Sequence, residues 1–405
     1  RCPRNAVDRD LEYLRRSGVE FRPGAELGVD YSMDELLGEG EGYGYDAVFL
    51  GIGAHRGLRL GIDGEDLEGV VTGVDYLRSI NLGLGQWTGK RVAVVGGGNT
   101  AMDAARAARR EGAEVTVLYR RTRAEMPAEE DEYEDSVAEG VRFEYLVQPI
   151  ELLGADGHVT GMRCVEMELG EPDASGRARP LPVAGSEHER EYDMVIPAIS
   201  QRPVWRWLRN WRAQAEADPS GHLSFTEWET VKVDPESMRT GHPKIFAGGD
   251  VVLGPSTIIE SMGQGRRAAE AIDKHLRDRP LDEFTTWVPP DDPRRGFEER
   301  PHPYASPYDE TDSVARVPMP KRRVEDRLLD YVAVDLGYSE EDARREAERC
   351  LRCGVCVECY ECERVCEVGA VLHEMLGETQ EIEVGQILVA TGFQLYDAGA
   401  MLQYG

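Results

Sequence analysis

The sequence predicts an α/β fold in which the strands of a mainly parallel sheet alternate with helices. Five short apolar runs are typical of buried parallel strands, which are nearly continuous in apolar residues. Helical segments lie between these runs as far as Arg279, and such interleaving indicates an open α/β sheet. The predicted strands are Asp46–Gly51, Arg91–Val95, Glu114–Tyr119, Asp193–Ile196 and Lys244–Ala247.

Length and charge narrow the functional classes. At roughly 150 residues per domain, the 405 residues suffice for two or three domains. The 47 Lys and Arg residues against 76 Asp and Glu residues give a net charge of −29. This argues against nucleic acid as a partner, because two negative surfaces repel each other. No apolar run approaches the ~18 residues of a membrane span, and we expect no secretion leader. From these two expectations we predict a cytoplasmic protein.

The first functional signal is a strand–turn–helix–strand segment over residues 90–121 whose turn reads G-x-G-x-x-A. This order and spacing are the fingerprint of a dinucleotide-binding βαβ unit. Gly96 permits the tight turn, Gly98 leaves room for a pyrophosphate, and Ala101 lets the helix approach the strand. The helix N-terminus then presents N–H groups and a positive dipole end to the phosphates. The predicted cofactor-binding residues of this turn are Gly96, Gly98, Asn99, Thr100 and Ala101.

The end of the second strand predicts which coenzyme binds. NAD-binding units place an acidic residue there to accept a hydrogen bond from the ribose 2′-hydroxyl. This chain has Arg120 and Arg121 instead, followed by Arg123. Because guanidinium groups suit a 2′-phosphate, we expect NADPH rather than NADH. The alternative is a solvated basic turn without a ligand.

A second glycine turn is found near residue 250. Gly248, Gly249 and Asp250 follow a short strand, and a helix that contains Gln264 and Gly265 comes next. Exposed backbone beside a carboxylate suits the hydroxyl groups of a flavin ribityl chain. The alternative is a strand–turn–helix unit that serves packing alone.

Five segments in this order resemble the small subunit of glutamate synthase and its relatives, among them the NADPH-binding flavoprotein of electron-bifurcating transhydrogenases. The resemblance covers about residues 4–276. The segments are RNAVDRDLEYLRRSGVEF, DAVFLGIGAHRGLRLGIDGEDLEGV, VAVVGGGNTAMDAARAARREGAEVTVLYRRTRAEMPA, VIPAISQRP and IFAGGDVVLGPSTIIESMGQGRRAAEAI.

The resemblance implies two nested Rossmann-like dinucleotide-binding domains of the pyridine nucleotide-disulfide oxidoreductase type. An NADPH-binding domain, residues 76–200, would be inserted into an FAD-binding domain made of residues 1–75 and 201–279. It also implies that Arg120 and Arg121 hold the 2′-phosphate. The residues it places at FAD are Gly249 and Asp250, with Gln264 and Gly265 at its pyrophosphate.

Two departures from the family pattern stand out. In that family, one strand of IGA type and one of AIGQ type cross between the two domains. In this chain the second crossover reads Ala198-Ile199-Ser200-Gln201, a mild change. The family also has an earlier G-x-G-x-x-G turn for the FAD adenosine, upstream of the segment that matches RNAVDRD. We therefore expect either that this sequence is a fragment or that another polypeptide supplies the first half of the FAD site.

Six of the eight cysteines form one closely spaced run. The last four have the C-x2-C-x2-C-x3-C spacing of bacterial ferredoxins, and a further C-x2-C precedes them. This predicts one or two [4Fe-4S] clusters, with their number left open. Zinc bound by four thiolates and unliganded thiols are the alternatives. The predicted metal ligands are Cys350, Cys353, Cys356, Cys359, Cys362 and Cys366.

The regions around the cysteines complete the expected organisation. Residues 280–338 are expected to form a proline-rich linker, and residues 339–380 a small ferredoxin-like segment that opens with an acidic helix at Ser339. Residues 381–405 begin a further module, with a weak resemblance to the heterodisulfide reductase large subunit. The remaining cysteines, Cys2 and Cys164, are expected to be ordinary free thiols.

These signals together predict an NADPH-dependent iron–sulfur flavoprotein. Electrons would pass from NADPH through FAD to the clusters and then to redox partner subunits or ferredoxin in a hetero-oligomeric complex. No catalytic acid or base is required, because the cofactor carries the chemistry. The alternatives are a non-catalytic electron-wiring or scaffold subunit and a glutamate synthase small subunit.

Overall fold

The computed structural model describes residues 4–38, 42–84, 91–172, 176–205, 223–281 and 315–348. The chain divides into two compact units. Unit 1 comprises Arg1–Thr311 and Met319–Gly337, and unit 2 comprises Asp312–Pro318 and Tyr338–Gly405. The six cysteines predicted as metal ligands and the expected module over residues 381–405 lie outside the described residues.

A four-stranded parallel sheet forms the centre of the predicted NADPH-binding domain. Its strand order is β10–β3–β4–β5, and the register pairs Val94 with both Ile196 and Val117. The predicted parallel strands are confirmed here, with ends that agree within a residue or two. The bounds are β3 Arg91–Val95, β4 Glu114–Tyr119, β5 Arg142–Tyr145 and β10 Met194–Pro197.

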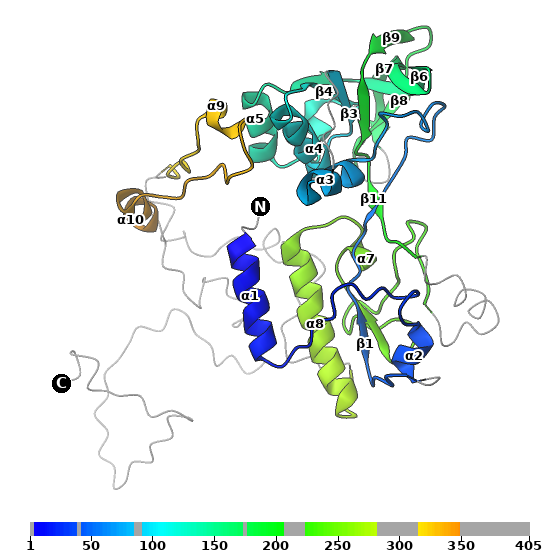
Figure 1. Cartoon of the computed structure of the whole chain (residues 1–405), viewed down its shortest axis with the longest axis vertical. Coiled ribbons are helices and arrows are strands. Elements are labelled where there is room, and N and C mark those ends of the chain that lie inside the picture. The colour runs from blue at the N-terminus through cyan, green and yellow to red at the C-terminus, as the bar shows by residue number, and fades with distance from the viewer. Residues whose placement is uncertain are drawn as a thin grey trace, which may run out of the picture. The chain divides into compact units, whose positions relative to one another are not determined.

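Alternating side chains bury this sheet on both faces. Val92 and Val94 of β3 pack with the helices, whereas Ala93 and Val95 pack with the antiparallel sheet. Successive residues of a strand point to opposite faces, so each strand contributes to two separate cores. The helices on the first face are α3 Gly73–Leu82, α4 Asn99–Arg110 and α5 Glu130–Ala138 (Figure 1).

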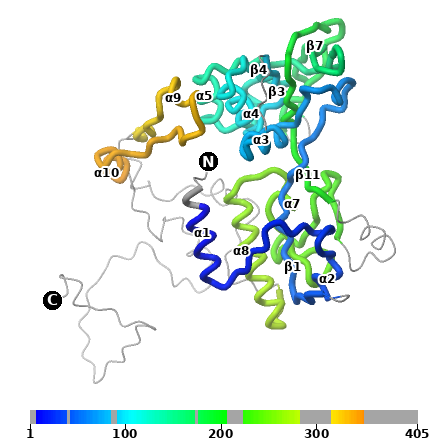
Figure 2. Tube along the Cα trace, in the orientation of Figure 1, coloured from blue at the N-terminus to red at the C-terminus, as the bar shows by residue number. Residues whose placement is uncertain are grey.

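The second face is covered by an antiparallel sheet in which β6, β8 and β9 all pair with β7. Met162 and Cys164 of β7 are fully buried against the parallel sheet. The trace in Figure 2 shows β7 running beside β3 and β4. The bounds are β6 Val147–Ala155, β7 His158–Pro172, β8 Ala178–Pro182 and β9 His188–Glu191.

The predicted FAD-binding region contains two parallel strands, β1 Val48–Leu50 and β12 Ile245–Ala247. Ile245 and Ala247 are fully buried, in a core that Met33 and Leu37 also enter. The crossover strands that the resemblance implies are present and pair with each other: β2 Arg56–Gly57 lies antiparallel to β11 Gln201–Arg202. The helices of this region are α1 Arg4–Arg16, α2 Met33–Leu37, α7 Asp250–Leu253 and α8 Ile258–Leu276.

Residues Met319–Gly337, part of the expected linker, belong to unit 1. They include α9 Val324–Arg327, and Arg327 is buried. The Arg327 guanidinium donates to the Asp135 carboxylate of α5 at 3.1 Å, and the Lys321 ammonium donates to the same carboxylate at 2.9 Å. This stretch of chain is therefore fastened to the nucleotide domain by buried charge pairs.

The same cluster joins α4 to the end of α5. Arg106 donates to both carboxylate oxygens of Glu139, at 2.7 and 3.1 Å, and Arg110 pairs with Glu139 at 3.1 Å. The Glu139 side chain is 0% exposed. A buried carboxylate needs such partners, because desolvation of an unpaired charge costs several kcal/mol. Glu139 thus fixes the helix whose N-terminus carries the predicted phosphate turn.

Replacing Glu139 with Ala should destabilise the nucleotide domain by about 3 kcal/mol, because Arg106 and Arg110 would lose the fully buried carboxylate between them. Arg106 would keep only its ion pairs with Glu132 and Asp135, which are more exposed than Glu139. Denaturant unfolding followed by circular dichroism measures the change. Glu191→Ala is the matched control, since Glu191 also pairs with an arginine, Arg91, but its side chain is 83% exposed. Equal losses for the two variants would contradict the role given to the buried cluster.

Unit 2 includes the predicted acidic helix. Helix α10 spans Glu340–Glu348, and the Ser339 hydroxyl accepts a hydrogen bond from the Asp342 N–H at 3.1 Å, as expected of an N-cap residue. The Val317 N–H donates a hydrogen bond to the Glu346 carboxylate at 2.8 Å, and this bond connects the irregular segment around Val317 to helix α10. Within the part of the chain that the structure describes, no helix combines the length and apolar character needed to cross a bilayer.

Candidate nucleotide-binding site

The glycine turn between β3 and α4 leaves no space for side chains at its first two glycines. Gly96 has a φ of +144°, and a Cβ there would lie 2.3 Å from the Ala198 carbonyl oxygen. A Cβ on Gly97 would lie 2.6 Å from the Tyr119 ring. The turn therefore fits between the crossover segment and the end of β4 only when both positions are glycine.

Gly98 is different, because its Cβ position is open. Among the described residues, no atom lies within 4 Å of it, and its backbone is extended, with φ −96° and ψ 177°. Gly98 is also the N-cap of α4 and has no side chain to bond the first N–H groups of the helix. The first N–H groups of a helix lack partners within the helix and attract anions. This open position beside a helix N-terminus fits a pyrophosphate, as the sequence predicts.

The first residues of α4 are held by neighbouring segments. The Asn99 side-chain oxygen accepts a hydrogen bond from the Glu129 N–H at 2.9 Å. The Thr100 hydroxyl accepts one from the Gln201 amide of β11 at 3.0 Å. Ala101 is fully buried against the turn. The helix N-terminus is thus fixed from two sides before any ligand arrives.

The loop that follows β4, which the sequence did not predict as part of the site, is hydrogen-bonded to the glycine turn. It contains the 3₁₀ helix η1 Arg123–Glu125. The Ala128 N–H donates to the Gly97 carbonyl at 3.0 Å, and the Tyr119 hydroxyl donates to the Glu125 carbonyl at 2.8 Å. Both bonds are accepted by backbone carbonyls, and the first is also donated by a backbone N–H, so no residue type in the loop indicates them in the sequence.

Arg120 and Arg121 line a cavity of about 700 Å³ beyond the end of β4. Arg120 is exposed, whereas Arg121 is 4% exposed and donates through Nε to the Ala178 carbonyl of β8 at 2.8 Å. Arg123 lies outside this lining, because it pairs with Glu130 and lies over the Tyr133 ring at 4.0 Å. The structure thus places both predicted arginines, Arg120 and Arg121, in one cavity lining, whereas the next arginine along the chain, Arg123, lies elsewhere.

The second glycine turn follows β12. Gly249 has a φ of +77°, and its N–H donates to the buried Gln264 side-chain oxygen at 2.7 Å. A Cβ on Gly248 would lie 3.1 Å from the Phe49 ring. Gln264, predicted at the FAD pyrophosphate, therefore uses its side chain to hold the turn against α8.

Asp250 begins α7 and is partly buried. Desolvation raises the pKa of the Asp250 carboxyl, although a hydrogen bond from the Ser256 backbone and the nearby His55 act in the opposite direction. No described atom lies within 4 Å of a Cβ on Gly265. A carboxylate beside a glycine turn suits hydroxyl groups such as those of the FAD ribityl chain, and the binding of FAD by these residues stays a prediction.

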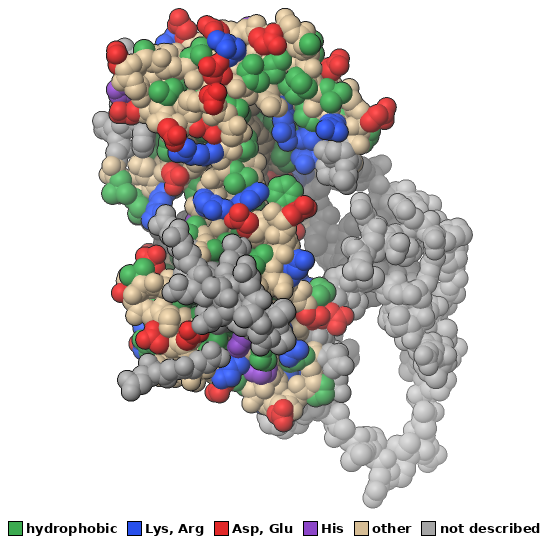
Figure 3. All heavy atoms as spheres, turned by 90° about the vertical axis from the view of Figure 1, so that its right-hand side faces the viewer, with side chains coloured by type: hydrophobic (Ala, Val, Ile, Leu, Met, Phe, Trp, Pro, Cys, Tyr) green, Lys and Arg blue, Asp and Glu red, His purple; other side chains and the backbone are tan. Residues whose placement is uncertain are grey.

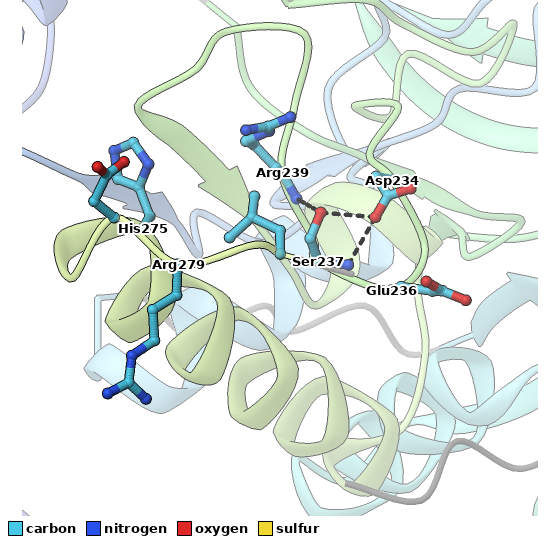
Figure 4. A pocket seen from close by; sticks show the side chains of 8 residues that line it. Asp234, Glu236, Ser237, Arg239, His275 and Arg279 are labelled. Atoms are coloured by element: carbon cyan, nitrogen blue, oxygen red, sulfur yellow. Dashed lines mark hydrogen bonds between the residues drawn. The ribbon is translucent and has the colours of Figure 1, made fainter. Parts of the chain in front are cut away.

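A second cavity, of about 570 Å³, contains none of the predicted site residues (Figure 4). The Asp234 carboxylate accepts hydrogen bonds from the Ser237 N–H and hydroxyl at 2.8 and 2.7 Å. Burial alone would raise the pKa of Asp234, but the bonds from Ser237 lower it overall. Figure 4 shows the Arg279 side chain pointing away from this pair. This cavity lies between the Asp234–Arg239 segment and the C-terminal end of α8, and we assign it no ligand.

Among the described residues, no cluster of His, Cys, Asp or Glu has the arrangement of a metal site. Cys164 is a buried free thiol, as expected, and burial raises the pKa of this thiol to about 12. It is therefore protonated at neutral pH and unsuited to metal binding. Cys2 lies outside the described residues.

Comparison with known proteins decides the family. The pyridine nucleotide-disulphide oxidoreductase family matches residues 7–265, a range that holds both glycine turns and more than half of the chain. The chain belongs to this family. The α/β fold with nested nucleotide-binding domains is thereby confirmed for these residues, as is the resemblance to the glutamate synthase small subunit.

The chain is 41% identical over 360 residues to the NADP(+)-dependent formate dehydrogenase subunit beta of Moorella thermoacetica, a match that covers 87% of this chain and 48% of the relative. It is 38% identical over 388 residues to the NADPH-Fe(3+) oxidoreductase subunit beta of Geobacter sulfurreducens, covering 87% of this chain and 54% of the relative. The chain spans about half the length of these curated relatives.

Two further matches cover shorter parts of the chain. The glutamate synthase [NADPH] small chain of Escherichia coli is 38% identical over 283 residues, covering 66% of this chain and 57% of that protein. The solved structure of Mycobacterium tuberculosis FprA in complex with NADPH matches with a TM-score of 0.52 and 19% identity, over 67% of this chain and 72% of that one. The latter match concerns the fold alone.

Replacing Gly98 with Val should leave the fold intact but weaken NADP+ binding about tenfold or more, which corresponds to ~1.4 kcal/mol. The reason is that the new side chain would fill the open space at the start of α4. Isothermal titration calorimetry measures binding, and circular dichroism measures folding. Gly96→Val is the contrasting variant and should lose stability, because its Cβ would meet the Ala198 carbonyl. Unchanged binding by a folded Gly98→Val protein would contradict the phosphate site.

Proposed function

We propose that this chain is the NADPH-oxidising part of an iron–sulfur flavoprotein that passes electrons from NADPH through FAD to [4Fe-4S] centres and a partner protein. The observation that carries the proposal is the open Gly98 position at the start of α4, together with the arginine-lined cavity at the end of β4. A pyrophosphate needs the first feature, and a 2′-phosphate needs the second.

In this proposal, the two glycine turns and the arginines at the end of β4 bind the two coenzymes. The α4 N-terminus, from Gly98 to Ala101, binds the pyrophosphate of NADPH, and Arg120 and Arg121 bind its 2′-phosphate. Gly249, Asp250 and Gly265 contact FAD, and the Gln264 side chain positions Gly249 through their 2.7 Å hydrogen bond. FAD, when bound, supplies the group that accepts a hydride and releases single electrons. No side chain is assigned as a catalytic acid or base.

Relatives favour electron transfer to a partner over glutamate synthesis. The formate dehydrogenase and NADPH-Fe(3+) oxidoreductase beta subunits each match 87% of the chain, whereas the glutamate synthase small chain of Escherichia coli matches 66%. The longer matches extend beyond residues 7–265 that the family covers. Six closely spaced thiols beyond that range suit iron–sulfur ligation. We therefore propose a subunit of a cytoplasmic redox complex.

The protein, isolated from its source together with any polypeptide that completes the FAD site, should show flavin and iron–sulfur absorption that bleaches when NADPH is added under anaerobic conditions. Iron and sulfide should be present and zinc absent by metal analysis. Zinc in place of iron would contradict the cluster assignment. Bound iron–sulfur with no flavin, and no bleaching by NADPH, would instead support a wiring or scaffold subunit and overturn the proposed reaction.

A further inference from the structure

A third arginine lies in the cavity that holds Arg120 and Arg121. Arg179 of β8 is part of the same lining, as are Gly170, Glu171 and Pro172 at the end of β7. The β7–β8 hairpin thus forms one wall of the cavity, and the end of β4 forms the other. The lining of this cavity, of about 700 Å³, therefore includes three arginine side chains and one acidic side chain, that of Glu171.

A hydrogen bond holds the two walls together. Arg121 is 4% exposed, and its Nε donates to the Ala178 carbonyl at 2.8 Å. The Arg121 carbonyl accepts a hydrogen bond from the Leu146 N–H at 3.2 Å, which fixes the backbone on the other side. Because Ala178 directly precedes Arg179, this contact fixes the backbone that carries Arg179 beside the end of β4.

A β-bulge lies directly opposite Arg179. The register pairs Leu169 with Pro180 and Pro172 with Ala178, so Gly170 and Glu171 together face Arg179. Two residues opposite one define a bulge, and bulges turn side chains toward binding sites. A Cβ on Gly170 would lie 2.8 Å from the Leu181 side chain. The glycine therefore allows the hairpin to close tightly at the point where Arg179 enters the cavity lining.

The local charge contrasts with the rest of the chain. The net charge is −29, and Figure 3 shows acidic and basic side chains interspersed over one face of the described residues. Three arginines around one cavity instead favour a ligand with two negative charges, and guanidinium groups bind phosphate oxygens in pairs. A phosphate monoester such as the 2′-phosphate of NADPH has this charge and these oxygens.

We propose that Arg179 is a specificity-determining residue, and that the β7–β8 hairpin closes the 2′-phosphate site by placing this third arginine opposite Arg120 and Arg121. The inference rests on the proposed NADPH function and adds a strand distant in sequence to its recognition site. It predicts that preference for the phosphorylated coenzyme depends on the hairpin as well as on the end of β4.

Calorimetric titration of the full-length chain tests this with two probes, 2′-phospho-ADP-ribose and ADP-ribose, which differ only in the 2′-phosphate. The wild-type protein should bind the phosphorylated probe more tightly. Arg179→Ala should raise the Kd for 2′-phospho-ADP-ribose about tenfold, since a charge-assisted hydrogen bond is lost, and should leave the Kd for ADP-ribose unchanged. Arg179→Lys should recover part of the difference.

Two further variants make the result specific. Arg177→Ala removes the same charge from the same hairpin outside the cavity lining, and it should change neither Kd by more than about twofold. Arg120→Ala should reduce discrimination as Arg179→Ala does. If Arg120→Ala loses discrimination while Arg179→Ala keeps it, or if Arg179→Ala weakens both probes equally, the role of Arg179 is overturned. A wild-type protein that binds neither probe, or both equally, would overturn the NADPH assignment itself.

Discussion

The close approach of backbone to backbone at the start of α4 is the constraint on which the rest of the nucleotide site depends. Gly96 lies so near the Ala198 carbonyl that a side chain cannot be present, and Gly97 is similarly close to the Tyr119 ring. This contact brings the crossover segment, the end of β3 and the end of β4 to one corner. The open side of that corner, at Gly98, is the N-terminus of the helix, where we propose that the pyrophosphate binds, because helix N-termini stabilise anions.

The surrounding packing serves to hold this corner still. The parallel sheet is buried on one face by α3, α4 and α5 and on the other by the antiparallel sheet. Helix α4 is fixed at its N-terminus by Asn99 and Thr100 and farther along by the ion pairs of Arg106 and Arg110 with Glu139. A site held in this way before a ligand arrives loses little conformational freedom on binding. The antiparallel sheet has a second role in our account, because its β7–β8 hairpin reaches the cavity at the end of β4.

Local patterns in the sequence were enough to predict five of the parallel strands and the glycine turn between β3 and α4, but not the antiparallel sheet of β6 to β9. These features depend on residues close together in the chain, such as Gly96, Gly98 and Ala101, whose spacing has a direct mechanical meaning. The support from Ala128 and Glu129 could not be predicted, because it is made through backbone N–H groups.

Arg179 was missed for another reason: strand pairing across a bulge brings it to the cavity that Arg121 lines, and no local motif encodes that pairing. The sequence also could not show that Met319–Gly337 contacts the nucleotide domain, because the ion pairs of Lys321 and Arg327 with Asp135 join residues far apart in the chain.

The most direct test of the account is a crystal structure of the full-length chain with NADP+ bound. We expect the pyrophosphate beside Gly98 at the N-terminus of α4, within hydrogen-bonding distance of backbone N–H groups, and the 2′-phosphate between the end of β4 and the β7–β8 hairpin. Electron density for the nucleotide at any other place, with the corner at Gly98 vacant at saturating NADP+, would contradict the central claim.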